Sequence, residues 1–182
     1  MNERPPKPPA PPPPTPKPPS PPPSLEEVAA QSDKANVIAL PPLIYGASLL
    51  LGIVIQLMFP ISFLPGSVGG WLGGLLILLS ILIVGSAFRA LGRAKTPFDV
   101  HQPTVAIVTD GAFRYSRNPM YLSLTLLYLG LTSLINSLWM LLLVMPLMVV
   151  MQRGVVEREE QYLEGKFGEE YLRYKMRVRR WI

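Results

Sequence analysis

Two long stretches without a charged side chain constrain this sequence more than any other feature. Residues 35–88 contain no Asp, Glu, Lys or Arg, and residues 118–152 contain none either. A bilayer core of roughly 30 Å needs about 20 apolar residues for each helix that crosses it. The first stretch is long enough for two such helices with a turn, and the second fits two shorter ones joined tightly. The sequence therefore predicts an all-α integral membrane protein with four transmembrane helices.

Turn-forming residues divide the two stretches into the expected helices, residues 42–59, 68–88, 119–135 and 138–154. Pro60 and Pro65 bracket the first turn, and Asn136 with Ser137 forms the second. Lys and Arg occur before the first helix, between the second and third, and after the fourth, but in neither turn. With four crossings these basic segments lie on one side, which the positive-inside rule makes cytoplasmic. We therefore expect a multi-pass protein with both termini in the cytoplasm.

The second expected helix is rich in glycine. Gly69 with Gly73, and Gly70 with Gly74, each form a pair of small residues four positions apart. Such pairs let two membrane helices approach closely. They predict close helix packing and lead to the hypothesis of a homodimer formed through this helix.

Four parts are expected along the chain. Residues 1–24 are mostly proline, which favours a solvated polyproline II conformation. This disordered tail serves either as a spacer or as a ligand for a partner with an aromatic groove. Residues 25–40 form a polar juxtamembrane segment, and residues 41–88 hold the first helix pair. Residues 89–182 hold a long loop, the second helix pair and a C-terminal helix, and are the candidate catalytic core.

Composition excludes several kinds of chemistry. The chain has no cysteine, which excludes disulfides, thiolate nucleophiles and cysteine metal sites. Its single histidine, His101, excludes a multi-histidine metal site within one chain, so no metal is expected. His101 itself is either an incidental loop residue or a proton acceptor. The net charge of +5 is explained by basic residues that flank membrane helices, so no nucleic-acid partner is expected.

The C-terminal segment has helical periodicity. Apolar side chains recur at spacings of three and four, at Leu163, Phe167, Tyr171, Tyr174 and Val178. Charged residues occupy the other faces, so we expect an amphipathic helix on the cytoplasmic surface. Gly168 is expected to divide this helix in two, and Trp181 to lie at the level of the lipid headgroups.

The loop before the third expected helix is the first place where chemistry is expected. It carries an apolar run at residues 105–108, and Asp110 with Gly111 marks a turn. Irregular backbone at membrane depth is tolerated only where protein covers it or where it lines a cavity. Asn118 fits the N-cap and Pro119 the first turn of the next helix. The exposed amides there either hold a carboxylate or are simply capped, beside an interfacial arginine.

Two carboxylates, Glu159 and Glu160, follow the fourth expected helix by a few residues. A carboxylate near a membrane cavity can accept hydrogen bonds from a ribose diol or balance a cation. The alternative is ordinary surface charge on an amphipathic helix.

Together these segments resemble a known signature. The run Arg117-Asn118-Pro119-Met120-Tyr121, an apolar stretch and then Glu159-Glu160 is similar to the Arg-His-Pro-x-Tyr and Glu-Glu motifs of the isoprenylcysteine carboxyl methyltransferase family and its phospholipid methyltransferase relatives. The segments on either side of the two motifs also agree with the family, and the resemblance covers roughly residues 90–181. Asn118 departs from the eukaryotic pattern, which has His, and Asn cannot titrate.

The resemblance implies S-adenosylmethionine as cofactor, bound at the cytoplasmic face. The implied cofactor-binding residues are Val105, Ala106, Ile107, Val108, Phe113, Asn118, Pro119, Met120, Tyr121 and Glu159. Ile107, Val108 and Phe113 are expected to enclose the adenosine, with the methionine carboxylate near Asn118 and Tyr121. The candidate catalytic residues are Arg117, Asn118 and Glu160. The substrate is expected to be a lipophilic or amphiphilic small molecule with a carboxylate, an amine or a thiol, and the residues do not choose among these.

The sequence leaves two alternative functions open. A membrane reductase of the sterol-reductase type would use NADPH and would need a basic cluster, for which Arg89, Arg93 and Lys95 are available. A non-enzymatic scaffold would instead recruit a partner to the membrane through the proline-rich tail.

Overall fold

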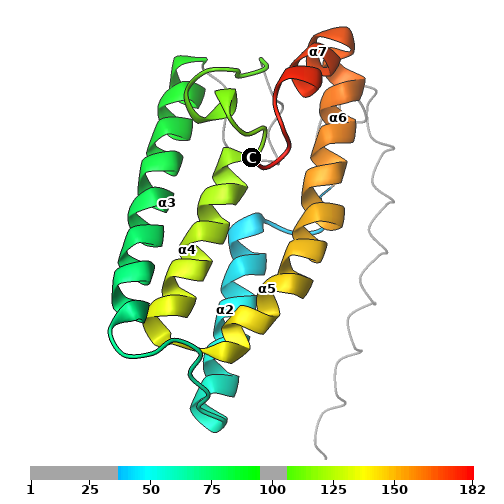
Figure 1. Cartoon of the computed structure of the whole chain (residues 1–182). Coiled ribbons are helices and arrows are strands. Elements are labelled where there is room, and N and C mark those ends of the chain that lie inside the picture. The colour runs from blue at the N-terminus through cyan, green and yellow to red at the C-terminus, as the bar shows by residue number, and fades with distance from the viewer. Residues whose placement is uncertain (1–36, 95–105) are drawn as a thin grey trace, which may run out of the picture. The chain divides into compact units, whose positions relative to one another are not determined.

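The computed structural model describes residues 37–94 and 106–182, and Figure 1 shows how their helices are arranged. No strand occurs among these residues. In chain order the elements are α2 Pro41–Met58, α3 Val68–Arg93, the 3₁₀ helix η1 Gly111–Arg114, α4 Pro119–Ile135, α5 Leu138–Met151, the π-helical turn η2 Gln152–Val156, α6 Glu157–Phe167 and α7 Glu169–Arg177. The all-α prediction is therefore confirmed for this part of the chain. The proline-rich tail, His101 and Val105 lie outside the described residues.

Three helical runs within the described ranges are long and apolar enough to cross a membrane: Pro41–Met58, Val68–Arg93 and Leu138–Phe167. The fourth apolar helix, α4, has 17 residues and is shorter. Two expected boundaries were wrong. Helix α3 continues to Arg93 because its buried face continues through Ala90 and Leu91. The last apolar helix does not end at residue 154, because η2 joins α5 to α6 without a break.

The helices pack in two pairs, α3 along α4 and α2 along α5. Glycines bring the backbones of α3 and α4 together: a Cβ added to Gly73 would lie 2.8 Å from the carbonyl oxygen of Gly130. A Cβ on Gly69 would lie 2.6 Å from the carbonyl oxygen of Ser133. The predicted close packing is thus confirmed for the Gly69/Gly73 pair. Gly70, in the other pair, has open space around its Cβ position.

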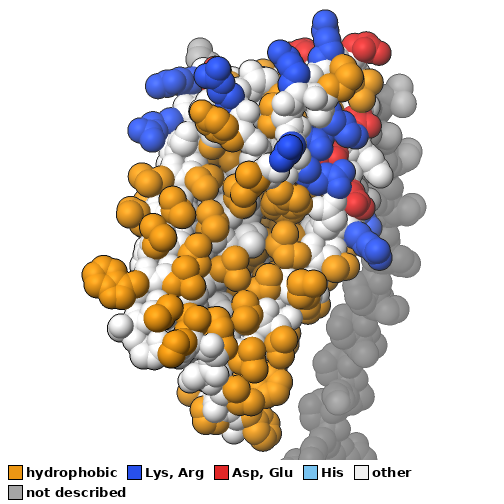
Figure 2. Space-filling model, in the orientation of Figure 1, with side chains coloured by type: hydrophobic (Ala, Val, Ile, Leu, Met, Phe, Trp, Pro, Cys, Tyr) orange, Lys and Arg blue, Asp and Glu red, His pale blue; other side chains and the backbone are white. Residues whose placement is uncertain are grey.

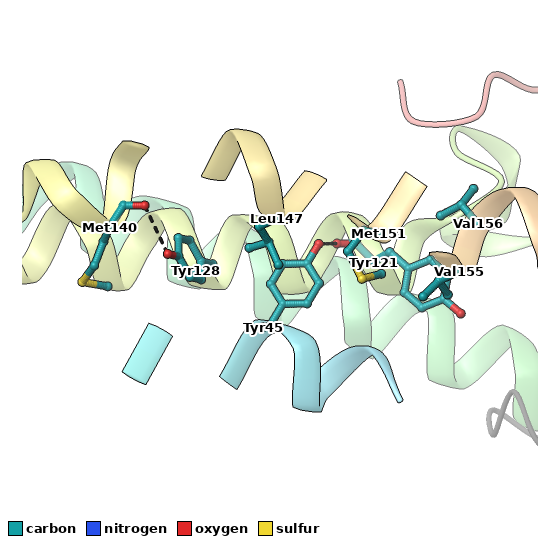
Figure 3. Close-up of a cluster of buried hydrophobic side chains, with 8 residues drawn as sticks. All are labelled: Tyr45, Tyr121, Tyr128, Met140, Leu147, Met151, Val155 and Val156. Atoms are coloured by element: carbon teal, nitrogen blue, oxygen red, sulfur yellow. Dashed lines mark hydrogen bonds between the residues drawn. The ribbon is translucent and has the colours of Figure 1, made fainter. Parts of the chain in front are cut away.

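A central cluster of buried side chains joins α2, α4 and α5 and continues into η2 (Figure 3). It consists of Tyr45, Tyr121, Tyr128, Met140, Leu147, Met151, Val155 and Val156. Its phenols have partners on neighbouring helices: Tyr128 donates to the carbonyl of Met140 at 3.1 Å, and Tyr45 donates to that of Tyr121 at 3.4 Å. Because no water is available in a bilayer core, such internal partners are needed for polar groups there.

The surface changes character along the bundle. Hydrophobic side chains cover most of the face seen in Figure 2, and the charged ones gather at one end. Trp71, Leu57 and Met145 are 82%, 79% and 74% exposed. Soluble monomers rarely expose such large apolar areas. Together with the three long apolar helices, this surface indicates a multi-pass membrane protein.

At the opposite end of the bundle, Asn136 confirms the tight turn expected between α4 and α5. It adopts a left-handed conformation with φ of 55°. Its side-chain oxygen accepts hydrogen bonds from the backbone amides of Phe63 and Leu64, at 3.0 and 2.8 Å. Its amide group donates to the carbonyl of Leu64 at 2.8 Å. One side chain therefore holds the two turns of this end together.

The C-terminal helix is divided at Gly168, as expected, with φ of 50° at that glycine. The apolar stripe does not lie on a surface throughout, because Tyr171 and Tyr174 are buried in the interior. Trp181 is half-buried against the central cluster, and its indole nitrogen donates to Gln152 at 3.2 Å. The break at Gly168 turns α7 back towards the bundle, which brings these aromatic side chains inward.

Candidate functional site

A cavity of about 660 Å³ lies where the charged end of the molecule meets the apolar helices. Its walls come from the beginning of α2, the second half of α3, the loop at residues 106–113, the beginning of α4, and α6 and α7. Most of the lining is apolar. The polar side chains that line it are Arg117, Asn118, Ser123, Glu159, Glu160 and the tyrosines 121, 171 and 174. A largely apolar cavity of this size with a few convergent polar groups is typical of a small-molecule site.

The two sequence motifs meet in this cavity. Every predicted site residue that the structure describes lines it: Ala106, Ile107, Val108, Phe113, Arg117, Asn118, Pro119, Met120, Tyr121, Glu159 and Glu160. Val105 lies outside the described residues. The fold thus brings the beginning of α4 against α6, although about forty residues separate them in sequence.

The π-helical turn η2 sets the register of α6. A π turn holds one residue more than an α turn, so it rotates the helix after it. The backbone amide of Ile38 donates to the carbonyl of Gly154 within this turn, at 3.1 Å. A side chain on Gly154 would meet Ile38, since its Cβ would lie 2.6 Å from the Ile38 Cδ1. The segment before α2 therefore packs directly on η2, next to the site.

Glu159 is bound to α4 through a tyrosine. The phenol of Tyr121 donates a hydrogen bond to the Glu159 Oε2 at 2.9 Å. Tyr121 is buried and Glu159 is half-buried on the cavity wall. This bond orients the carboxylate, since a single donor fixes one oxygen and leaves the other available to a ligand.

Glu160 is buried between two arginines. Arg180 binds it with both arms of its guanidinium group, Nε to Oε1 at 3.0 Å and Nη2 to Oε2 at 2.7 Å. The Nη1 of Arg117 lies 3.2 Å from the Oε1. The hydrogen bond to Glu160 raises the pKa of Arg180 further. A carboxylate engaged in this way is suited to positioning, and its predicted catalytic role remains a prediction.

Arg117 has unused hydrogen-bonding capacity. Its side chain is 8% exposed and lines the cavity. Its Nε and Nη1 are buried; Nη1 forms the ion pair with Glu160, whereas Nε has no hydrogen-bond partner within the described part of the chain. A buried donor without a partner is costly. The geometry therefore suits an anionic group in the cavity, which would supply the missing acceptor.

Asn118 occupies the predicted N-cap position, but its side chain does not cap α4. Its amide nitrogen instead donates to the carbonyl of Arg180 at 3.0 Å. Its own backbone amide donates to the Ser116 side chain at 3.1 Å. The Asn118 side chain is thus used for this tertiary contact with the C-terminal residues and not for capping the amides of the first turn.

The loop before α4 is held against α3 and α7. Gly111 has φ of 59°, and a Cβ there would lie 3.1 Å from the Ser86 Oγ. Glycine is therefore required at this position, because its φ is positive and because the loop backbone lies close to α3. On the other side, the phenol of Tyr174 donates to the carbonyl of Phe113 at 2.7 Å. Burial raises the pKa of Tyr171 and of Tyr174, so both phenols remain neutral donors at physiological pH.

Several cavity residues were not predicted. The phenols of Tyr171 and Tyr174 belonged to the predicted apolar stripe, so their inward face could have been anticipated from its periodicity. Arg180, which binds Glu160 but does not line the cavity, gave no such signal, because a basic residue near a C-terminus resembles ordinary surface charge. The apolar wall contributed by α2 and α3 comprises Pro41, Pro42, Leu43, Val84, Phe88 and Leu91, which looked like membrane-facing residues.

Comparison with known proteins connects this site with one family. A family model described as "Phospholipid methyltransferase" matches residues 68–170, a range that contains both motifs. A protein of Haemophilus influenzae, described as an uncharacterized protein, is 46% identical over 63 residues, which are 35% of this chain and all of that protein. No solved structure matches the chain.

Proposed function

The chain belongs to the phospholipid methyltransferase family, a family of membrane methyltransferases related to isoprenylcysteine carboxyl methyltransferase. On that premise we propose that it is an S-adenosylmethionine-dependent membrane methyltransferase acting on a lipophilic or amphiphilic substrate. One observation carries the proposal: the Arg117–Tyr121 motif and Glu159 meet in a single cavity with an otherwise apolar lining.

The chemistry of the cavity fits the cofactor. S-adenosylmethionine, when bound, supplies a methyl group on a positively charged sulfur. Ile107, Val108 and Phe113 form an apolar wall suited to adenosine. The free oxygen of Glu159 suits a ribose hydroxyl, and the unpartnered Nε of Arg117 suits a carboxylate. All three features lie in one cavity, so they would be available to one ligand.

We assign the chain's own residues mainly to binding, orientation and the exclusion of water. Methyl transfer is an in-line displacement that depends mostly on positioning when the nucleophile is already charged. Tyr121 orients Glu159, and Arg117 lies on the cavity wall beside Glu160. Phe88 and Leu91, from α3, keep the substrate side of the cavity apolar. Whether the nucleophile is a carboxylate, an amine or a thiol remains open; the last two must also lose a proton.

We propose four membrane crossings, with α4 as the fourth. Helix α4 packs along α3, which is itself long enough to cross. Its 17 residues would cross the membrane if the bilayer thins slightly around the helix, or if the side chains that flank the helix extend to the headgroups. The positive-inside rule then places both termini, and the cavity, at the cytoplasmic side.

The activity test uses membranes that contain the expressed protein. They are incubated with S-adenosylmethionine labelled on its methyl group, and the lipid extract is analysed for label. The proposal predicts labelled lipid with the wild-type protein, none with Glu159→Gln, and unchanged labelling with Glu169→Gln, an exposed carboxylate on α7. The absence of label from the complete lipid extract of wild-type membranes would contradict the proposal.

The two alternatives gain no support. The reductase hypothesis needs a basic cluster at the cofactor site, but Arg89 and Arg93 are exposed and lie outside the cavity lining. Lys95 and the proline-rich tail lie outside the described residues.

The homodimer also remains a hypothesis. Gly70 and Gly74 leave an open face on α3 that a second copy would cover, and crosslinking in native membranes would test this.

A further inference from the structure

The last residues of the chain form a strap over the beginning of α4. We use this name for residues 178–182, which return from α7 to the start of α4 (Figure 1). Two of its backbone carbonyls accept three hydrogen bonds from the loop before α4. The Arg117 amide donates to Arg179 at 2.9 Å, and the side chains of Ser116 and Asn118 donate to Arg180 at 3.3 and 3.0 Å.

The Arg180 side chain continues this link to α6. Its guanidinium group forms a two-armed contact with Glu160, whose side chain is 5% exposed. Two-armed contacts between arginine and carboxylate are among the strongest and most directional hydrogen-bonded pairs. Arg180 therefore connects two side chains of the motif loop, Ser116 and Asn118, to the second carboxylate of the other motif.

Arg180 and Arg117 compete for the same carboxylate. Only one guanidinium can form the two-armed contact, and Arg180 occupies that position. Arg117 keeps a single-armed ion pair, 3.2 Å from Nη1 to the Glu160 Oε1, and a side-chain hydrogen bond with Tyr171, while its Nε has no hydrogen-bond partner in the described part of the chain. Because both arms of Arg180 hold Glu160, the Nε donor of Arg117 remains without a partner on the cavity wall.

We propose that Arg180 is a positioning residue that keeps Arg117 free to bind an anionic group of the cofactor, by occupying Glu160 in its place. This inference rests on the proposed function. Without the Arg180 guanidinium, Glu160 would rotate to form its own two-armed contact with Arg117. That arginine would then be withdrawn from ligand binding, although the backbone hydrogen bonds of the strap would persist.

The test measures the affinity of purified full-length protein for S-adenosylhomocysteine by calorimetry, together with the unfolding midpoint in detergent. For Arg180→Gln we expect affinity to fall about tenfold, the order expected for a lost hydrogen bond to a charged group. The matched control is Arg177→Gln, which removes the same charge from the exposed end of α7 and should bind as the wild type does.

A double variant separates positioning from simple tethering. In Arg180→Gln with Glu160→Gln the competing carboxylate is gone, so Arg117 is released and affinity should recover most of the loss. If Arg180 acted only as a tether, the affinity would not recover in the double variant, because both partners of the tethering contact would be missing. A double variant that binds no more tightly than Arg180→Gln would overturn the proposal, as would unchanged affinity in Arg180→Gln itself.

Failure of the inference can be told apart from failure of the proposed function. Wild-type protein that is folded but does not bind S-adenosylhomocysteine would overturn both. Wild-type binding without any effect at Arg180 would overturn this inference alone.

Discussion

Tyr121 donates a hydrogen bond to Glu159 across 2.9 Å, and this contact joins the first turn of α4 to the first turn of α6. Each residue belongs to one of the two sequence motifs. The contact therefore shows why the motifs occur together: one supplies a carboxylate for the cavity wall, and the other fixes its orientation. The π-helical turn before α6 contributes by setting the direction in which Glu159 points.

We predict that Tyr121→Phe weakens S-adenosylhomocysteine binding about tenfold, because a hydrogen bond to a charged group contributes roughly 1.5–3 kcal/mol. Calorimetry on detergent-purified protein measures this. The matched control is Tyr128→Phe, which removes an equally buried phenol that donates to Met140, outside the cavity lining. Equal affinity for Tyr121→Phe and wild type would contradict the role assigned to this contact.

The glycines of α3 make a second pair of matched variants. Gly73→Ala places a Cβ 2.6 Å from the Leu134 Cγ and 2.8 Å from the Gly130 carbonyl oxygen. Overpacking of this kind typically costs about 1–3 kcal/mol, so the unfolding midpoint should fall. Gly74→Ala has open space and gains about 1 kcal/mol of helix propensity, so its midpoint should be unchanged or higher. The reverse order in a thermal unfolding assay would show that α3 and α4 do not pack as described.

Asn136 provides a test of the turns at the far end of the bundle. Asn136→Ala removes three hydrogen bonds, each contributing about 1 kcal/mol, and places alanine in a left-handed conformation. Asn136→Gly loses the same bonds but tolerates the conformation. Both should unfold at lower temperature than wild type, and the alanine variant at the lowest. If alanine and glycine variants match the wild type, the side-chain bridge between the turns contributes nothing.

The absence of cysteine makes the topology directly testable. We predict that a single cysteine at Ser67→Cys, in the turn before α3, is labelled by a membrane-impermeant maleimide from outside intact cells. A cysteine at Met176→Cys, 79% exposed on α7, should be labelled only after the membrane is opened. Labelling of both positions from the same side would contradict an odd number of crossings between them and, with it, the crossing of the membrane by α3, α4 and α5 together.

Much of the bundle could be predicted because membrane helices are encoded by simple patterns. Charge-free length, proline and the Asn136 turn located the four apolar helices well. The boundary after α5 could not be predicted, since a π turn leaves the apolar pattern intact while it changes the direction of α6. Likewise, nothing near Gly168 indicated how far α7 would turn back towards the cavity.

The candidate site, like the bundle, could be predicted only in part. The two motifs identified its polar side, since their residue types suit a ligand with a diol and a carboxylate. The apolar wall from Phe88 and Leu91 was not predicted, because side chains that line a cavity and side chains that face lipid have the same composition. Arg180 was missed because its importance depends on a tertiary contact with Glu160, twenty residues away.

The most direct test of the proposed function is calorimetric binding of S-adenosylmethionine to the detergent-purified wild-type protein and to Glu159→Gln, with NADPH as a second ligand. We predict binding of S-adenosylmethionine to the wild type, weaker binding to Glu159→Gln and no binding of NADPH. Binding of NADPH without S-adenosylmethionine, or binding of neither by folded protein, would contradict the central claim that this cavity serves methyl transfer.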